Sequence, residues 1–258
     1  MDSLKVKTIN DFINAGEKPE ILFWVGSAGS FDERAKKITR AFVKILNKAN
    51  INFAVLGDQE SSSGDAAKRA GNEFLFQMQA LMNIEILNSY DITNIVTTCP
   101  HSYNTLKNEY SDLGGIYKVT HHTEFISDLI KQGKLNLTTD FNYRKITYHD
   151  PCYLARGNDI YDSPRDLIAN LNIDFVEMPR NKRKSFCCGA GGAQMFKEAE
   201  NGKFEINIVR TEEALKTGAD VIATGCPFCN TMITDGVKNI SEGQAQVKDI
   251  AELIAECI

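Results

Sequence analysis

The sequence contains no long hydrophobic run and no excess of positive charge. Its longest apolar runs, such as residues 21–25, fall far short of the roughly 20 residues that a membrane-spanning helix needs. Residues 1–20 lack the basic head and the apolar run of a secretory signal. The 29 basic side chains face 34 acidic ones, and the net charge of -5 argues against a generic attraction to nucleic acid or to anionic lipid. These absences predict a cytoplasmic protein.

Cysteine, in contrast, is present in an informative pattern. Five of the seven cysteines fall in three short segments of the second half of the chain, namely Cys152, the pair Cys187 and Cys188, and the C-P-F-C segment with Cys226 and Cys229. In a reducing cytosol, such tight spacing is more typical of a metal or redox site than of structural disulfides. The glycines that follow the pair are better explained by these cysteines than by a dinucleotide fingerprint, because no convincing G-x-G-x-x-G motif is present.

Short apolar segments alternate with helical patterns along the chain. Apolar runs that end in glycine or turn residues predict strands, whereas apolar residues at helical spacing predict helices. The predicted strands cover residues 19–26, 53–56, 92–98, 146–149, 175–178 and 221–224, and the clearest helices cover residues 34–48 and 72–87. The second helix is aromatic and apolar at residues 74–82, and we expect it to lie in the core. The alternation predicts an α/β fold with mainly parallel sheets.

The second half of the chain repeats motifs of the first half. Ser27 lies 125 residues before Cys152, and Gly64 lies 125 residues before Gly189. The same offset relates Ser62 and Ser63 to Cys187 and Cys188, and an offset of 127 relates Cys99 and Ser102 to Cys226 and Cys229. A near-constant offset at this many motif positions indicates an internal duplication.

The duplication predicts two Rossmann-like lobes related by a pseudo-two-fold axis. The first lobe would cover residues 1–130 and the second lobe residues 145–258. Residues 131–144 are polar and rich in asparagine, threonine and lysine, so we expect them to form the linker.

The cysteines of the second half follow predicted strands or lie on a glycine-bearing turn. Parallel α/β sheets present their ligand sites at the carboxyl ends of the strands, and a helix N-terminus favours the thiolate form that binds metal. Five thiolates exceed the four that a tetrahedral zinc ion needs, and adjacent cysteines seldom both bind one zinc ion. An iron-sulfur cluster fits this count better. The residues alone leave three alternatives: a zinc site that uses four of the five, buried structural cysteines, and a thiol-disulfide pair at Cys226 and Cys229.

At these residues the sequence resembles the CCG-domain, or cysteine-rich domain, iron-sulfur proteins. This family includes a subunit of heterodisulfide reductase and the iron-sulfur subunits of glycolate oxidase, anaerobic glycerol-3-phosphate dehydrogenase and lactate-utilisation complexes. Its motif is a cysteine, then C-C-G, then C-x-x-C, and the resemblance extends over both halves of the chain. It implies a 4Fe-4S cluster, which is an unusual non-cubane one in the best understood members. The ligands that the resemblance implies here are Cys152, Cys187, Cys188, Cys226 and Cys229.

The first half departs from the family motif. Only Cys99 is kept where a two-cluster relative would have cysteines, and the other positions are Ser27, Ser62, Ser63 and Ser102. A serine hydroxyl does not ionise readily near pH 7 and is a poor ligand for soft iron-sulfur centres. We therefore expect the first lobe to hold no cluster and to serve as a scaffold or to form a cleft against the second site.

Histidines suggest two further hypotheses. Cys99 together with His101, His121 and His122 would suit a zinc ion in the first lobe, although solvated or core histidines are the more ordinary interpretation. His149 precedes Cys152 in the sequence H-D-P-C. There it would hydrogen-bond a cluster sulfur, shuttle a proton, or simply end the strand.

The resemblance implies electron transfer within an oxidoreductase complex. Electrons would pass between a flavin dehydrogenase or a disulfide substrate and a ferredoxin-like or membrane quinone-linked partner. The chain has no C-x2-C-x2-C-x3-C-P run, so a partner would have to supply the ferredoxin clusters. The protein would be cytoplasmic and would reach the membrane only through that partner. The alternative function is a zinc-stabilised or metal-free scaffold within such a complex.

Overall fold

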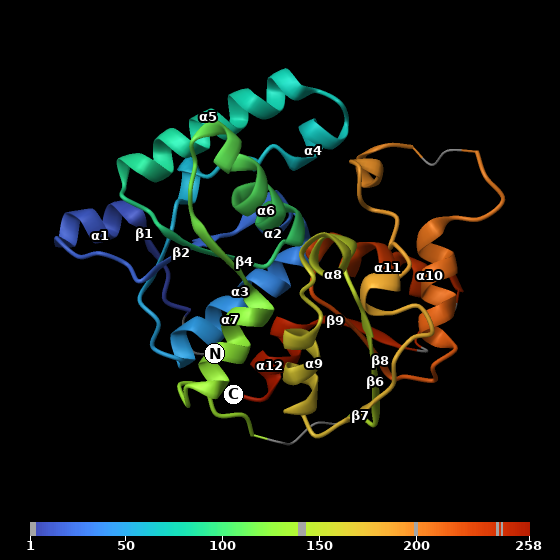
Figure 1. Cartoon of the computed structure of the whole chain (residues 1–258). Coiled ribbons are helices and arrows are strands. Elements are labelled where there is room, and N and C mark those ends of the chain that lie inside the picture. The colour runs from blue at the N-terminus through green and yellow to red at the C-terminus, as the bar shows by residue number, and fades with distance from the viewer. Residues whose placement is uncertain (1–3, 139–142, 199–200, 241–242, 244) are drawn as a thin grey trace.

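The computed structural model describes residues 4–138, 143–198, 201–240, 243 and 245–258. Two β-sheets, in which every described pairing is parallel, lie in two adjacent lobes with helices around and between them (Figure 1). This arrangement confirms the predicted two-lobe α/β fold. The interval predicted as a linker, 131–144, includes residues 139–142, which lie outside the described part of the chain.

The first lobe contains a five-stranded sheet with the order β1-β3-β2-β4-β5. Its strands are β1 (Lys7–Thr8), β2 (Ile21–Trp24), β3 (Phe53–Val55), β4 (Asn94–Thr97) and β5 (Lys118–His121). Its helices are α1 (Ile9–Ala15), α2 (Gly26–Phe31), α3 (Glu33–Lys48), α4 (Asp65–Arg69), α5 (Glu73–Ser89), α6 (Pro100–Asn104) and α7 (His122–Lys131). Helix α3 begins where the Asp32 carboxylate accepts the Ala35 N–H at 2.7 Å, and its apolar side chains form one buried face.

The second lobe contains a four-stranded sheet with the order β7-β6-β8-β9. Its strands are β6 (Lys145–His149), β7 (Asp174–Phe175), β8 (Val221–Thr224) and β9 (Gln246–Asp249). Its helices are α8 (Cys152–Asn158), α9 (Asp162–Ala169), α10 (Ile206–Leu215), α11 (Pro227–Ile240) and α12 (Ile250–Glu256). The strand predicted at residues 175–178 is shorter and begins one residue earlier, because the chain leaves this sheet edge and turns Met178 into the core.

The pairing register shows the internal duplication directly. Trp24 of β2 lies opposite Thr97 of β4, and His149 of β6 lies opposite Thr224 of β8. These equivalent residues are separated by 125 and 127 positions, which are the offsets of the sequence motifs. Because β3-β2-β4-β5 and β7-β6-β8-β9 have the same order, equivalent strands present their carboxyl ends at equivalent places.

The two lobes share one hydrophobic core. Helices α3 and α7 of the first lobe pack against α9, α11 and α12 of the second. Side chains from both lobes, such as Phe23, Ile146 and Leu253, are fully buried in this common core. Across the same interface, the Arg34 guanidinium donates two hydrogen bonds to the Glu252 carboxylate, at 2.8 and 2.6 Å. The lobes are therefore parts of one packed body.

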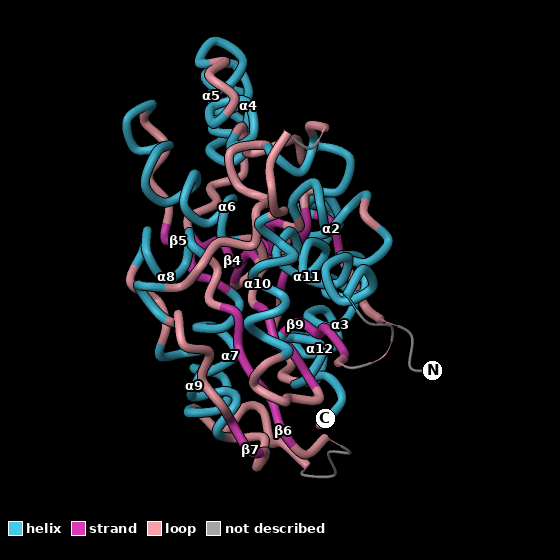
Figure 2. The backbone as a smooth tube through the Cα atoms, turned by 90° about the vertical axis from the view of Figure 1, so that its right-hand side faces the viewer, coloured by secondary structure: helices cyan, strands magenta, loops and turns pink. Residues whose placement is uncertain are grey.

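Helix α5 corrects the expectation that residues 74–82 lie in the core. Phe74 is 75% exposed and Met82 is 54% exposed, whereas Phe76 and Ala80 on the opposite face are buried. Figures 1 and 2 show α5 along the outer edge of the first lobe, next to α4. Both faces of this helix are apolar, although only one of them is buried. The composition of the helix therefore could not predict that its other face is exposed. Within the described residues, no helix combines the length and apolar character that crossing a membrane requires.

Candidate metal centre

The cysteines of the second lobe lie at the carboxyl ends of its two central strands and on the loop between them. Cys152 is the first residue of α8 and follows β6 after two residues. Cys226 lies between β8 and α11, and Cys229 lies in the first turn of α11. Strands β6 and β8 are parallel neighbours, so their ends meet at one edge of the sheet.

The structure brings all five of these cysteines together. The Sγ atoms of Cys188 and Cys229 are 3.2 Å apart. Cys187 forms side-chain hydrogen bonds with both Cys152 and Cys188, and Cys226 does so with Cys229. The predicted set is thus continuous in space, although its members span 78 positions from Cys152 to Cys229. The other two cysteines lie outside this group of thiols. Cys99 lines a cavity that residues of both lobes surround, and it is close enough to Cys226 to interact with it electrostatically. Cys257 lies in the shared core.

Burial divides the cysteine set into an inner and an outer part. Cys188, Cys226 and Cys229 are at most 3% exposed, whereas Cys152 and Cys187 are half-buried. A group held by the set would therefore be shielded from water on the inner side and approachable on the outer side.

Two of the five sulfurs favour the thiolate form. Hydrogen bonds from the Cys152 and Cys188 thiols hold the pKa of Cys187 well below its usual range. Burial acts to raise the pKa of Cys226, but hydrogen bonds with Cys229 and the charge of the neighbouring His101 outweigh it and leave this pKa below its usual value. The remaining three thiols have raised pKa values, chiefly because each hydrogen-bonds a neighbouring sulfur. Since the thiolate binds metal, a metal would replace the protons that these sulfurs share.

The glycine of the C-C-G sequence holds the turn on which Cys187 and Cys188 lie. Gly189 has a φ of +92°, in the left-handed region that favours glycine, and its N–H donates to Cys187 Sγ at 3.3 Å. A Cβ at this position would lie 3.2 Å from Ile206 Cβ. The turn therefore requires glycine both for its backbone conformation and for its packing.

The first lobe contains the same turn with serine in place of cysteine. Gly64 has a φ of +87°, and its N–H donates to Ser62 Oγ at 3.2 Å. The serine positions surround a cavity of about 60 Å³, against which the second lobe packs Ala190 and Phe228. The first-lobe residues that line it include Ser27, Ser62, Ser63, Cys99, His101 and Ser102. The structure thus brings the predicted relic positions together as one site.

His149 lies beside the cysteine set, as the sequence predicts. One of its ring nitrogens lies with the Sγ atoms of Cys188 and Cys229 in a group whose atoms are all within 4.8 Å of one another. Its Nδ1 accepts a hydrogen bond from Arg210 Nε at 2.9 Å, and its Nε2 is buried with no hydrogen-bond partner among the described residues. Burial and the Arg210 charge hold the pKa of His149 well below its usual value, so the ring is neutral.

Arg210 is a site residue that the sequence prediction missed. It is fully buried and lies on α10, far from the cysteine motifs in sequence. A signal does exist, because Asn207, Arg210, Thr211 and Ala214 follow helical spacing on the buried face of α10. An arginine on an inward-facing stripe is rarely buried without a specific partner.

The other histidines lie in separate networks instead of one zinc site. His101 Nδ1 lies 2.8 Å from the Asp65 carboxylate. His122 lies 3.2 Å from His121 and 2.9 Å from Asp249 of the second lobe, and all three are fully buried. His101 lines the same cavity as Cys99, but His121 and His122 do not. Among the described residues, no group of three potential metal ligands includes Cys99, so the geometry gives no support to the zinc hypothesis for that lobe.

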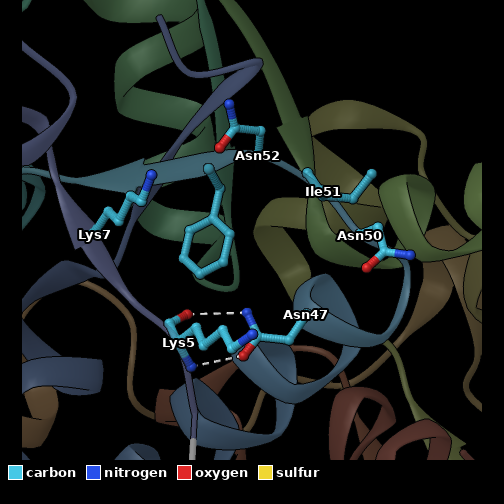
Figure 3. Close-up of a pocket in the computed structure, with 7 residues that line it drawn as sticks. Lys5, Lys7, Asn47, Asn50, Ile51 and Asn52 are labelled. Carbon is cyan, nitrogen blue, oxygen red and sulfur yellow. Dashed lines mark hydrogen bonds between the residues drawn. The ribbon is translucent and has the colours of Figure 1, made fainter. Parts of the chain in front are cut away.

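A larger cavity of about 280 Å³ lies at the opposite edge of the first sheet (Figure 3). Its polar side chains include Lys5, Lys7 and Asn47, and the Asn47 amide forms hydrogen bonds of 2.8 and 2.9 Å with the Lys5 backbone. This cavity lies beside the start of β3, whereas the cysteine and serine sites lie at the carboxyl ends of strands. It holds no cysteine, histidine or carboxylate.

Comparison with known proteins places the two repeats in one family. The family model described as "Cysteine-rich domain" (CCG) matches residues 21–107 and again residues 146–234. The chain is 44% identical to the "Probable iron-sulfur-binding oxidoreductase FadF" of Bacillus subtilis and 42% identical to the "EtfAB:quinone oxidoreductase" of Syntrophomonas wolfei. These alignments cover 98% and 93% of this chain but only 36% and 34% of the relatives.

A more distant relative covers most of this chain as well. It is one chain of the dihydromethanophenazine:CoB--CoM heterodisulfide reductase of Methanosarcina barkeri, and it is 31% identical over 94% of this chain and 60% of its own length. The chain therefore spans about a third of the length of the FadF and EtfAB:quinone oxidoreductase relatives, and somewhat more than half of the length of the heterodisulfide reductase chain. Because the family model matches both lobes over most of their length, this chain belongs to the cysteine-rich domain (CCG) family.

Proposed function

We propose that this chain is an iron-sulfur electron-transfer subunit of an oxidoreductase complex, with one 4Fe-4S cluster in the second lobe. The observation that carries the proposal is the meeting of five thiols at one edge of a parallel sheet, three of them almost fully buried. The names of the similar FadF and heterodisulfide reductase proteins support an iron-sulfur role. The non-cubane form of the cluster is part of the proposal, because five sulfur ligands exceed four irons.

The residues present fit such a cluster. Sulfur is the ligand that iron-sulfur centres use, and the set would comprise Cys152, Cys187, Cys188, Cys226 and Cys229. The buried Nε2 of His149 lacks a partner within the described residues, and a cluster sulfur would provide one. A zinc ion would use four ligands at most and would leave one thiol and this nitrogen unexplained.

When bound, the cluster would supply a one-electron carrier. The chain's own residues would control its surroundings. The inner cysteines exclude water, Gly189 directs its amide toward Cys187 Sγ, and the half-buried outer cysteines leave one side open to a partner or a substrate. Burial and hydrogen bonds of this kind set the potential of an iron-sulfur centre.

We propose that the first lobe holds no cluster. Its serine site has hydroxyls in place of thiols, and these are poor ligands for iron-sulfur centres. The cavity that these serines surround also contains residues of the second lobe, which favours a role in supporting the second site.

The proposed partners follow from what the chain lacks. It has no ferredoxin run of cysteines, and it spans about a third of the relatives named as oxidoreductases. A partner, or a further part of a longer protein, would therefore supply ferredoxin-type clusters. On one side we propose a flavin dehydrogenase. The name of the EtfAB:quinone oxidoreductase supports a quinone-linked partner on the other side, which we propose to be membrane-bound. The chain would then be cytoplasmic and peripheral to the membrane through that partner.

The test is iron and sulfide analysis with an absorption spectrum, on protein purified without oxygen. We expect a brown protein with about four irons and about four sulfides per chain. Cys187→Ser combined with Cys188→Ser should lose both. The matched control is Ser62→Ala combined with Ser63→Ala, which changes the equivalent pair of the first lobe and should leave the iron content unchanged.

Two results would contradict the proposal. A colourless protein with one zinc ion per chain would favour a zinc-stabilised scaffold, and free thiols with no metal after anaerobic reconstitution would favour a metal-free one. Loss of iron in the serine-pair control would contradict the assignment of the cluster to the second lobe.

A further inference from the structure

A buried arginine beside the cysteine set determines how His149 can act. Arg210 Nε donates to His149 Nδ1 at 2.9 Å, and Arg210 Nη1 donates to the Arg180 carbonyl oxygen at 2.9 Å. Nη1 also lies 3.1 Å from the Glu213 carboxylate. Because it is anchored by a carbonyl and a carboxylate and is fully buried, the guanidinium has a fixed orientation toward the imidazole.

This contact determines the tautomer of the imidazole. An arginine side chain has donors and no acceptor, so Nδ1 of His149 must use its lone pair to accept the hydrogen bond. The single proton of the neutral ring is then on Nε2. This N–H is buried and has no acceptor among the described residues, although such unpaired groups are rare and costly. One ring nitrogen of His149 lies within 4.8 Å of the sulfurs of Cys188 and Cys229. With Nδ1 engaged, Nε2 is the ring nitrogen that remains to donate to a sulfur.

We propose that Arg210 fixes His149 as a hydrogen-bond donor to a sulfur of the cluster or of its ligands, and thereby prevents it from acting as an iron ligand. The inference rests on the proposed function, because the acceptor belongs to the cluster site. A nitrogen that carries a proton has no lone pair for iron. A donor at a cluster sulfur stabilises the added negative charge of the reduced state, so it raises the reduction potential.

The first lobe supports a donor role for this position. Trp24 ends β2 as His149 ends β6, and the two residues are 125 positions apart. An indole Nε1 is a donor only and cannot bind a metal. This nitrogen is also buried without a partner in the described part of the chain. Both lobes therefore present a ring N–H at the end of the equivalent strand, and Trp24 offers a matched control.

The tautomer can be tested without any cluster. We expect ¹⁵N NMR of histidine-labelled full-length protein, before cluster insertion, to show His149 with Nε2 protonated and Nδ1 unprotonated. Arg210→Met should abolish this fixed assignment, and Arg210→Lys, which keeps a donor, should preserve it. A His149 signal with the proton on Nδ1 in the parent protein would overturn the inference whether or not a cluster binds.

The effect on the cluster requires a redox titration of the loaded protein followed by electron paramagnetic resonance. His149→Leu should keep the iron content and shift the midpoint potential to more negative values. His149→Gln, whose amide can still donate, should remain close to the parent, and Trp24→Phe should cause no shift. An unchanged potential in His149→Leu, or a directly bonded ¹⁵N coupling from His149 to iron, would overturn the donor role. Absence of any cluster would instead contradict the proposed function, and the NMR result would still decide the tautomer.

Discussion

At the scale of single residues, Glu60 shows how the serine-containing lobe uses a half-buried acid. Its carboxylate accepts the N–H groups of Val25 and Gly26 at 3.0 and 2.6 Å. Burial raises the pKa of Glu60 from 4.5 to about 7 in spite of these hydrogen bonds. The folded protein therefore binds this proton more tightly than the unfolded chain does.

This difference makes stability depend on pH. The contribution of Glu60 is fully present below about pH 4.5 and is lost as the pH rises through about 7. Across this window we expect the free energy of unfolding of the parent protein to fall by about 3 kcal/mol relative to that of Glu60→Gln. Each unit of pKa difference between the folded and unfolded states corresponds to about 1.4 kcal/mol. Urea unfolding at several pH values measures the effect. Glu85→Gln, at an exposed position of α5, is the control, and parallel pH profiles for parent and Glu60→Gln would contradict the prediction.

The sequence predicts which cysteines lie together, but it does not predict that Arg210 lies beside their site. Cys226 and Cys229 stand in one short motif whose spacing directly indicates a shared ligand. Arg210, in contrast, meets His149 only because α10 packs beside the end of β6, and no short motif joins residues 61 positions apart. Glu60 is similar, because its burial depends on the packing of the whole lobe. Sequence spacing detects local partners, whereas these contacts are created by the fold.

At the scale of elements, the C-C-G turn can be tested by comparing two of its glycines. Gly189 and Gly192 both have positive φ, but only at Gly189 would a new Cβ meet a neighbour, Ile206 Cβ at 3.2 Å. Replacement of either glycine by alanine should lower the free energy of unfolding by about 1–2 kcal/mol, because alanine disfavours the left-handed conformation. Gly189→Ala should cost more and should also reduce iron retention, because it displaces the amide that contacts Cys187.

Thermal unfolding and iron analysis of the two alanine variants make this comparison. We expect Gly192→Ala to keep its iron. Equal stability and equal iron content in both variants would show that crowding at Gly189 is unimportant.

The elements that the sequence predicts least well are those at the edges. Strands β5 and β9 read Lys-Val-Thr-His and Gln-Val-Lys-Asp, and such short polar segments do not differ from loops in composition. Their identity follows from pairing with β4 and β8, whose buried runs are easily predicted. The boundaries proposed for the lobes, 1–130 and 145–258, stay a prediction.

At the scale of the whole molecule, the Arg34–Glu252 pair links the lobes. The two side chains are only 20% and 15% exposed, and Arg34 also donates to the Val247 carbonyl oxygen at 2.8 Å. We expect Arg34→Met to lower the free energy of unfolding by about 2 kcal/mol, because the partners of a charged donor are left unpaired. The effect should persist in high salt, since screening is weak for partly buried pairs.

Chemical unfolding in low and high salt measures this loss. Lys18→Met is the control, because Lys18 and Asp91 form a pair that is more than 80% exposed on both sides. Such a pair should contribute less than about 1 kcal/mol. A cost for Arg34→Met as small as that of the control would contradict the prediction and leave the shared apolar core as the main link between the lobes.

The serine version of the turn has a consequence for how the protein is assembled. In the first lobe the Gly64 amide closes this turn on an oxygen, so its shape comes from the backbone and not from iron. Small zinc domains, in contrast, fold only when their metal arrives. We expect the proposed cluster to bind to a site that is already folded. Calorimetry should then record little change in heat capacity, because little apolar surface becomes buried at that moment. The protein without a cluster would then be a stable, folded intermediate of assembly.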